Sequence, residues 1–143
     1  MIIKSVIFCD DIRQEIGNKI SAMGIFGDDL NFEVPADAPT DIPLPVSLGF
    51  ILILERTDIK NDLKDFDVNI SVVIENKEFA KIGVKIETIG SGKTIHLPVP
   101  RFTFPVSKST TFVTNTQILE KGLLVTESSA TLNINMNRRT VST

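Results

Sequence analysis

The chain has 143 residues, 42% of them hydrophobic, with a formal net charge of −3 and a single cysteine. These values fit one globular domain with its own hydrophobic core and exclude a disulfide-stapled secreted scaffold. The chain also lacks the excess of lysine and arginine that binding to nucleic acid or to anionic lipid requires, so we expect neither a nucleic acid nor a membrane as a partner.

In chain order, the first predicted strands cover residues 2–9, 18–26 and 46–55. The N-terminus has no basic start, long apolar region or small-residue cleavage site, so we expect no signal peptide and a cytoplasmic location. Residues 48–54 are nearly all apolar. Such a strand is covered on both faces within the domain, or its outer face meets a partner. Phe50 and Leu52 are therefore candidate interface residues.

Hydrophobic residues alternate with polar ones over 66–74 and again over 80–86, separated by the polar turn 75–78. This period of two predicts an antiparallel hairpin with one buried face. Strands are also predicted at 109–118, 122–128 and 132–136, with a tight turn at Gly122 and another turn at 90–92. The helical signal is thin, and only Asp58 to Phe66 is long enough for one or two turns.

Prolines mark the two segments 35–45 and 97–105 as connections or sheet edges, because proline lacks the donor that an inner strand needs. The resulting expectation is an all-β fold, an antiparallel β-sandwich of about seven to nine strands, immunoglobulin-like or C2-like. We expect a single sandwich domain over residues 1–143, with 137–143 as a frayed tail.

Four ionisable side chains of mixed sign follow the first strand directly: Asp10, Asp11, Arg13 and Glu15. Carboxylates grouped in a loop suit a ligand or a hard cation, and Arg13 suits a partner-docking patch. The alternative is structural, with Arg13 paired to Asp11 or Glu15 and holding the loop between the first two strands. The structural interpretation is favoured because short motifs are weak evidence for a site.

The same stretch resembles the opening of a family of uncharacterised small β-proteins from bacteria and phages, with a Cys-Asp-Asp-x-Arg-x-Glu motif. The matching residues lie within the first 27 positions: Cys9, Asp10, Asp11, Arg13, Glu15, Gly17, Lys19, Gly24 and Gly27. The resemblance implies a β-sandwich and an association with bacteria or phages, so the cytoplasmic location expected above would be that of a bacterium or a phage-infected bacterium. It implies no activity.

The segment 97–105 carries Phe102 and Phe104, whose rings point the same way in an extended chain. They either cap the core or form an exposed apolar anchor for a partner.

Catalytic and metal signatures are weak throughout. The single histidine, His96, alternates like a surface strand residue, and Cys9 follows an apolar strand like a small core hydrophobe. One histidine and one cysteine do not make a structural zinc site, and the glycine pattern before Lys93 lacks the first glycine of a phosphate loop. We therefore expect no catalytic residues, no metal and no cofactor.

The function expected from the sequence is a non-enzymatic binding or assembly module that binds a protein partner or associates with itself. The resemblance adds a phage context to this expectation. The alternative is a small-ligand or cation-binding protein, or an enzyme, that uses Asp10, Asp11, Arg13 and Glu15.

Overall fold

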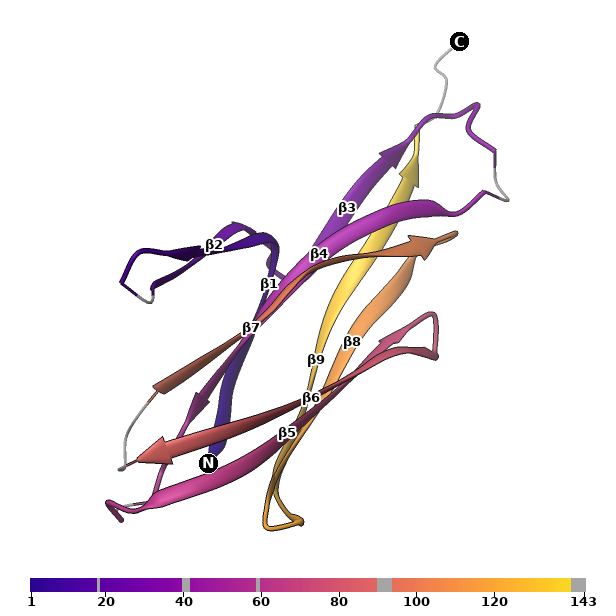
Figure 1. Ribbon diagram of the computed structural model, residues 1–143. Helices are drawn as coiled ribbons and strands as arrows, with labels where there is room; N and C mark the ends of the chain where they lie inside the picture. Colours follow the sequence, from indigo (N-terminus) through magenta and orange to yellow (C-terminus); the bar gives the residue numbers. More distant parts are fainter. Residues whose placement is uncertain (18, 40–41, 59, 90–93, 140–143) are drawn as a thin grey trace.

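The computed structural model is a sandwich of two β-sheets and describes residues 1–17, 19–39, 42–58, 60–89 and 94–139 (Figure 1). The strands are β1 (Ile2–Glu15), β2 (Lys19–Ile25), β3 (Asp29–Val34), β4 (Leu44–Glu55), β5 (Leu63–Ile74), β6 (Lys77–Ile89), β7 (Thr94–Val106), β8 (Thr110–Glu120) and β9 (Leu123–Arg138). Nine strands in two layers confirm the predicted sandwich.

The first sheet has four strands in the order β2-β1-β4-β7. β7 is an edge strand, as its prolines predict, because a missing N–H group is tolerated at an edge. β1 pairs with β4 only as far as Cys9, which lies opposite Gly49. Beyond Cys9, β1 pairs with β2 alone, and Figure 1 shows this hairpin leaving the sandwich. We call residues 10–25 the arm.

The second sheet has five strands in the order β3-β9-β8-β5-β6. The predicted hairpin is present as β5 and β6, with positive φ at Glu75 and Asn76 in its turn. The β8–β9 turn has φ values of 50° at Lys121 and 78° at Gly122, as the glycine predicts. One pair departs from the antiparallel expectation, because β3 runs parallel to β9.

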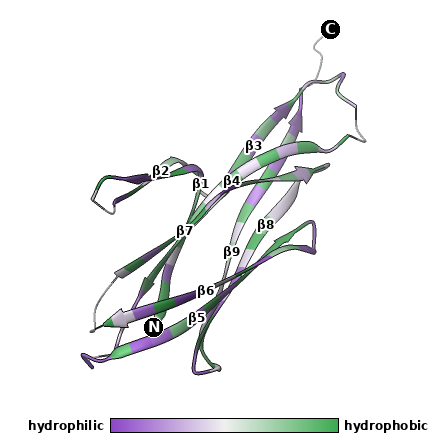
Figure 2. Cartoon of the chain, viewed as in Figure 1, coloured by the Kyte–Doolittle hydropathy of each residue, from purple (hydrophilic) through white to green (hydrophobic). Residues whose placement is uncertain are grey.

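The core lies between the sheets, where every second residue is buried along β5, β8 and the second half of β9. Figure 2 shows this alternation of hydrophobic and hydrophilic residues along β3 and β9. The rings of Phe8, Phe50 and Phe112 meet edge to face at its centre, with centroids 5.7 to 6.3 Å apart. Phe50 and Leu52 are fully buried, so the suggestion that they meet a partner is wrong.

Two further local predictions are wrong. The segment before β5 forms no helix in its described residues, because its carbonyl groups turn inward to bind the buried Arg56. The predicted frayed tail begins at Asn137, but β9 continues along β3 as far as Arg138, and the Arg139 amide donates to the Val34 carbonyl. The predicted turn at 90–92 and residues 140–143 lie outside the described residues.

Candidate functional site

The acidic and basic side chains singled out by the sequence lie on the arm rather than in a loop. β1 continues as a strand through Glu15, so successive side chains point to opposite faces. Asp11, Arg13 and Glu15 share one face, whereas Asp10 lies on the other and faces Gly24. Arg13 Nε lies 3.7 Å from an Asp11 oxygen, and both side chains are well exposed. The structure therefore does not bring the four groups into one pocket.

Cys9 and His96 do not form a catalytic pair. Cys9 lies opposite Gly49 on one side of β4, and His96 lies opposite Ile53 on the other side. Four residues along a strand amount to roughly 13 Å before the sideways separation is added. Cys9 is fully buried, and burial together with the nearby Asp10 and Asp11 charges raises the pKa of its thiol. The predicted role as a core hydrophobe is confirmed.

Phe102 and Phe104 cap the core. Phe104 is buried and Phe102 is half-buried. Both rings lie within 6 Å of the Phe112 ring, and Phe102 stacks on Phe79 at 6.1 Å. They join β7 to the facing sheet, so the alternative of an exposed anchor is wrong for these rings.

The densest charge network surrounds Arg56, which the sequence analysis did not single out. Arg56 is the first residue after β4, and its side chain is fully buried. Nε lies 2.6 Å from Asp58 Oδ1, and Nη2 lies 3.0 Å from Asp58 Oδ2, a bidentate pair. The guanidinium also donates to the carbonyls of Lys60, Asp62 and Thr88 and to the Asp62 carboxylate.

These contacts occupy every donor of the guanidinium, so Arg56 has no free group for a ligand. The hydrogen bond from Arg56 holds the pKa of Asp58 well below its usual range, and Lys64, 3.1 Å away, contributes to this. The same pairing raises the pKa of Arg56. Through Arg56, the network connects the residues between β4 and β5 to Thr88 near the end of β6, which is a structural role.

A different surface collects a set of polar side chains. It is the outer face of β6, β5, β8 and β9, where the strand registers align two neighbouring cross-strand rows. The first row is Lys81, Ser71, Asn115 and Ser129, and the second is Gly83, Asn69, Gln117 and Glu127. We call these eight residues the amide face.

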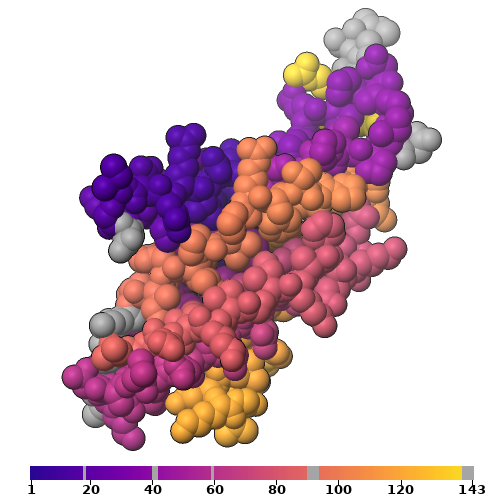
Figure 3. Space-filling view, viewed as in Figure 1, coloured from indigo at the N-terminus to yellow at the C-terminus, as the bar shows by residue number. Residues whose placement is uncertain are grey.

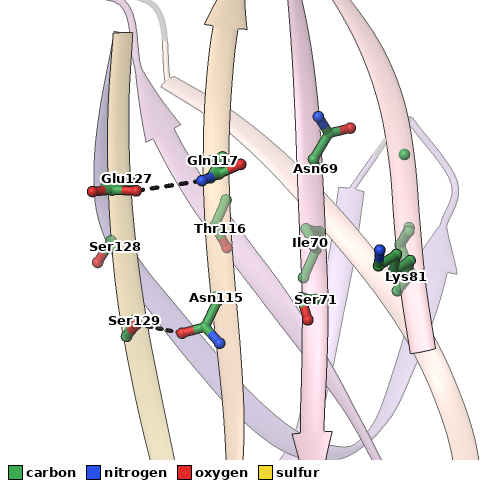
Figure 4. Close-up of a pocket in the computed structure, with 12 residues that line it drawn as sticks. Asn69, Ile70, Ser71, Lys81, Asn115, Thr116, Gln117, Glu127, Ser128 and Ser129 are labelled. Carbon is green, nitrogen blue, oxygen red and sulfur yellow. Dashed lines mark hydrogen bonds between the residues drawn. The ribbon is translucent and has the colours of Figure 1, made fainter. Parts of the chain in front are cut away.

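The amide face lines a hollow of about 890 Å³ (Figure 4). Within it, Ser129 Oγ donates to Asn115 Oδ1 at 2.5 Å, and Gln117 Nε2 donates to Glu127 Oε2 at 3.4 Å. Gly83 leaves one position of the second row without a side chain. A glycine within a strand often marks a bulge, a tight bend, or a place where a ligand or another backbone approaches closely.

The side chains of this face offer hydrogen-bond donors and acceptors. An amide side chain offers both donors and acceptors, and a hydroxyl group can do either. The described residues contain no group of three or more histidine, cysteine or acidic side chains placed to hold a metal ion. Nor does any described helix have the length and apolarity to cross a membrane.

Fold and site together define an all-β sandwich with a hollow polar sheet face. No family model matches the chain, and no curated protein matches it. The family resemblance of the first 27 residues therefore stays an interpretation. A solved structure titled "Structure of the N-terminal domain of PorA" is 14% identical, covering 94% of this chain and 98% of that chain. Its TM-score is 0.31, so this likeness carries no argument about function.

Proposed function

We propose that this chain is a non-enzymatic binding module that recognises a neutral, hydroxyl-rich ligand, such as an oligosaccharide, on the amide face. The observation that carries the proposal is the pair of cross-strand rows beside the gap at Gly83. These rows place amide and hydroxyl groups, which both donate and accept hydrogen bonds, around a hollow that is open to a ligand.

The composition of the face selects the ligand class. Five of its eight residues are neutral amides or hydroxyls, and its charged residues are one lysine and one glutamate. Lys81 lies 3.7 Å from Glu78, so its charge is partly compensated nearby. The face therefore offers little charge to complement a strongly charged ligand. It offers hydrogen-bond donors and acceptors on four strands to a ligand with a chain of hydroxyl groups.

The expected affinity is modest. The face presents no aromatic ring, and the chain has neither tryptophan nor tyrosine to stack on a sugar. Hydrogen bonds that replace bonds to water contribute only about 0.5–1.5 kcal/mol each. Several such bonds together correspond to a dissociation constant in the range of roughly 0.1 to 10 mM.

Titration with neutral cello-, malto-, xylo- and chito-oligosaccharides tests the proposal, with a sulfated oligosaccharide as the charged control. The account predicts saturable binding of at least one neutral series that exceeds binding of the charged control. Binding of the sulfated control alone, or of none of these compounds, would contradict it.

A further inference from the structure

The arm is an incomplete piece of sheet. Its two strands extend beyond the last contact between β1 and β4, and β2 has no strand on its outer side among the described residues. A hairpin of two strands is marginally stable in water by itself, and three or more strands are needed for independent stability. In Figure 3 the indigo atoms of the arm extend outward from the body of the molecule.

The four sheet edges differ in how they are protected against pairing with another chain. Lysines on β6, prolines on β7 and acidic residues on β3 are features that discourage edge-to-edge association. The residues concerned are Lys77, Lys81 and Lys85 on β6, Pro98, Pro100 and Pro105 on β7, and Asp29 and Glu33 on β3. On β2 a single lysine stands at the first position, and Met23 and Ile25 are 45% and 62% exposed.

The backbone of β2 directs hydrogen-bonding groups outward at alternate residues. At the base of the arm, the Phe26 amide donates to the Phe8 carbonyl at 2.9 Å. From there to the tip the β1–β2 register continues without a shift. Because hydrogen-bonded pairs alternate in an antiparallel ladder, Lys19, Ser21 and Met23 point their N–H and C=O groups away from β1.

We infer that β2 pairs antiparallel with β2 of a second copy of this chain, with the two Ser21 residues opposite each other. A two-fold axis between identical strands lets each copy supply the same donors and acceptors to the other. The pairing joins two arms into one four-stranded sheet. This inference does not depend on the amide face, which belongs to the other sheet.

Charge complementarity favours a second copy and this register. One face of the arm aligns Asp11 with Met23 and Glu15 with Lys19. When the two β2 strands pair antiparallel with Ser21 opposite Ser21, Lys19 of one copy lies opposite Met23 of the other. The lysine stem then covers the exposed methionine and carries its ammonium group toward Asp11. The two Arg13 side chains remain three strand spacings apart, about 14 Å.

Cysteine cross-linking tests this register. The two Ser21 Cα atoms would stand about 5.5 Å apart, within the range of a disulfide. Ser21→Cys is therefore expected to give a disulfide-linked dimer under mild oxidation. The control Lys19→Cys places its two cysteines about 13 Å apart along the strands, and is expected to stay unlinked. The native Cys9 is fully buried and common to both variants.

Light scattering of the wild type is expected to give twice the chain mass of 15.8 kDa. Ser21→Pro removes an outward N–H group without removing a bond to β1, so it is expected to give the mass of one chain with the circular dichroism of a β-protein. A wild type with the mass of one chain at high concentration overturns the inference. So does equal cross-linking of the two cysteine variants, or a Ser21→Pro variant that remains a dimer.

Discussion

Gly83 lies directly opposite Asn69 in the β5–β6 pair, and a Cβ atom on Gly83 would stand 3.6 Å from Oδ1 of Asn69. This is an ordinary contact distance, so the strand accepts a side chain here without strain. The empty position therefore shapes the hollow of the amide face and is not required by the fold.

Gly83→Leu is expected to fill the hollow and weaken oligosaccharide binding at least about tenfold, which is about 1.4 kcal/mol. The melting temperature should stay the same or rise slightly, because glycine weakens a strand. Isothermal titration and thermal unfolding measure the two effects. Gly27→Leu makes the same chemical change where nothing lies within 4 Å, and it should bind as the wild type does. Equal binding by both variants would count against the amide face.

Arg56→Met is expected to lower the melting temperature by about 10 °C or more, because it leaves the carbonyl groups of Lys60, Asp62 and Thr88 without their donor and removes the cation that Asp58 and Asp62 share. Thermal unfolding at neutral pH measures this effect. Lys64→Met removes a cation that also contacts Asp58 but is partly exposed, and a smaller change is expected. If the Lys64 variant loses as much stability as the Arg56 variant, the structural role assigned to Arg56 is wrong.

Asp58→Asn is expected to reduce the sensitivity of the fold to acid. The pKa of Asp58 is lowered in the folded chain, so the unfolded chain binds more protons below an ordinary aspartate pKa of about 3.9. The stabilisation from Asp58 is therefore present above that pH and lost as the pH falls further.

The variant should melt at a lower temperature than the wild type at pH 7, and the difference should shrink as the pH falls below about 4. Melting curves between pH 2 and pH 7 measure this difference. The exposed Asp37→Asn variant is the control and should follow the wild type. A constant difference over the whole pH range would contradict the linkage.

Thr114→Val is expected to stabilise the chain by about 1 kcal/mol, because a buried hydroxyl without a hydrogen bond is replaced by a methyl group of the same shape. Thr114 is 1% exposed, and its Oγ1 has no partner among the described residues. The melting temperature should rise by roughly 3–6 °C. Thr131→Val on the exposed face of β9 should change it little. A lower melting temperature for Thr114→Val would show that the hydroxyl is satisfied in solution.

The fold was predictable where one strand face is buried and the other exposed. The alternation from Phe66 to Ile74 predicts β5 with its register toward the core, and Gly122 predicts the β8–β9 turn. The continuation of β1 through Glu15 was not predictable in this way. None of the described residues of the arm is fully buried, so its charged residues show no period of two and resemble a loop.

The sites were less predictable than the fold. The segment from Arg56 to Asp62 resembles a solvated loop. Nothing in that segment reveals that β6 approaches it and that the Thr88 carbonyl accepts a hydrogen bond from the guanidinium. The amide face depends on four strands in register. Asn69 and Gln117 are neighbours only through β5–β8 pairing, and no local pattern reveals that alignment.

The most direct test of the central claim is to follow the side-chain amide NMR signals of Asn69, Asn115 and Gln117 while a neutral oligosaccharide is added. The account predicts that these signals shift and saturate together, and that the Asn31 amide on β3, outside the hollow, stays in place. Binding that shifts other regions and leaves these three amides unchanged would contradict the assignment of the amide face as the binding site.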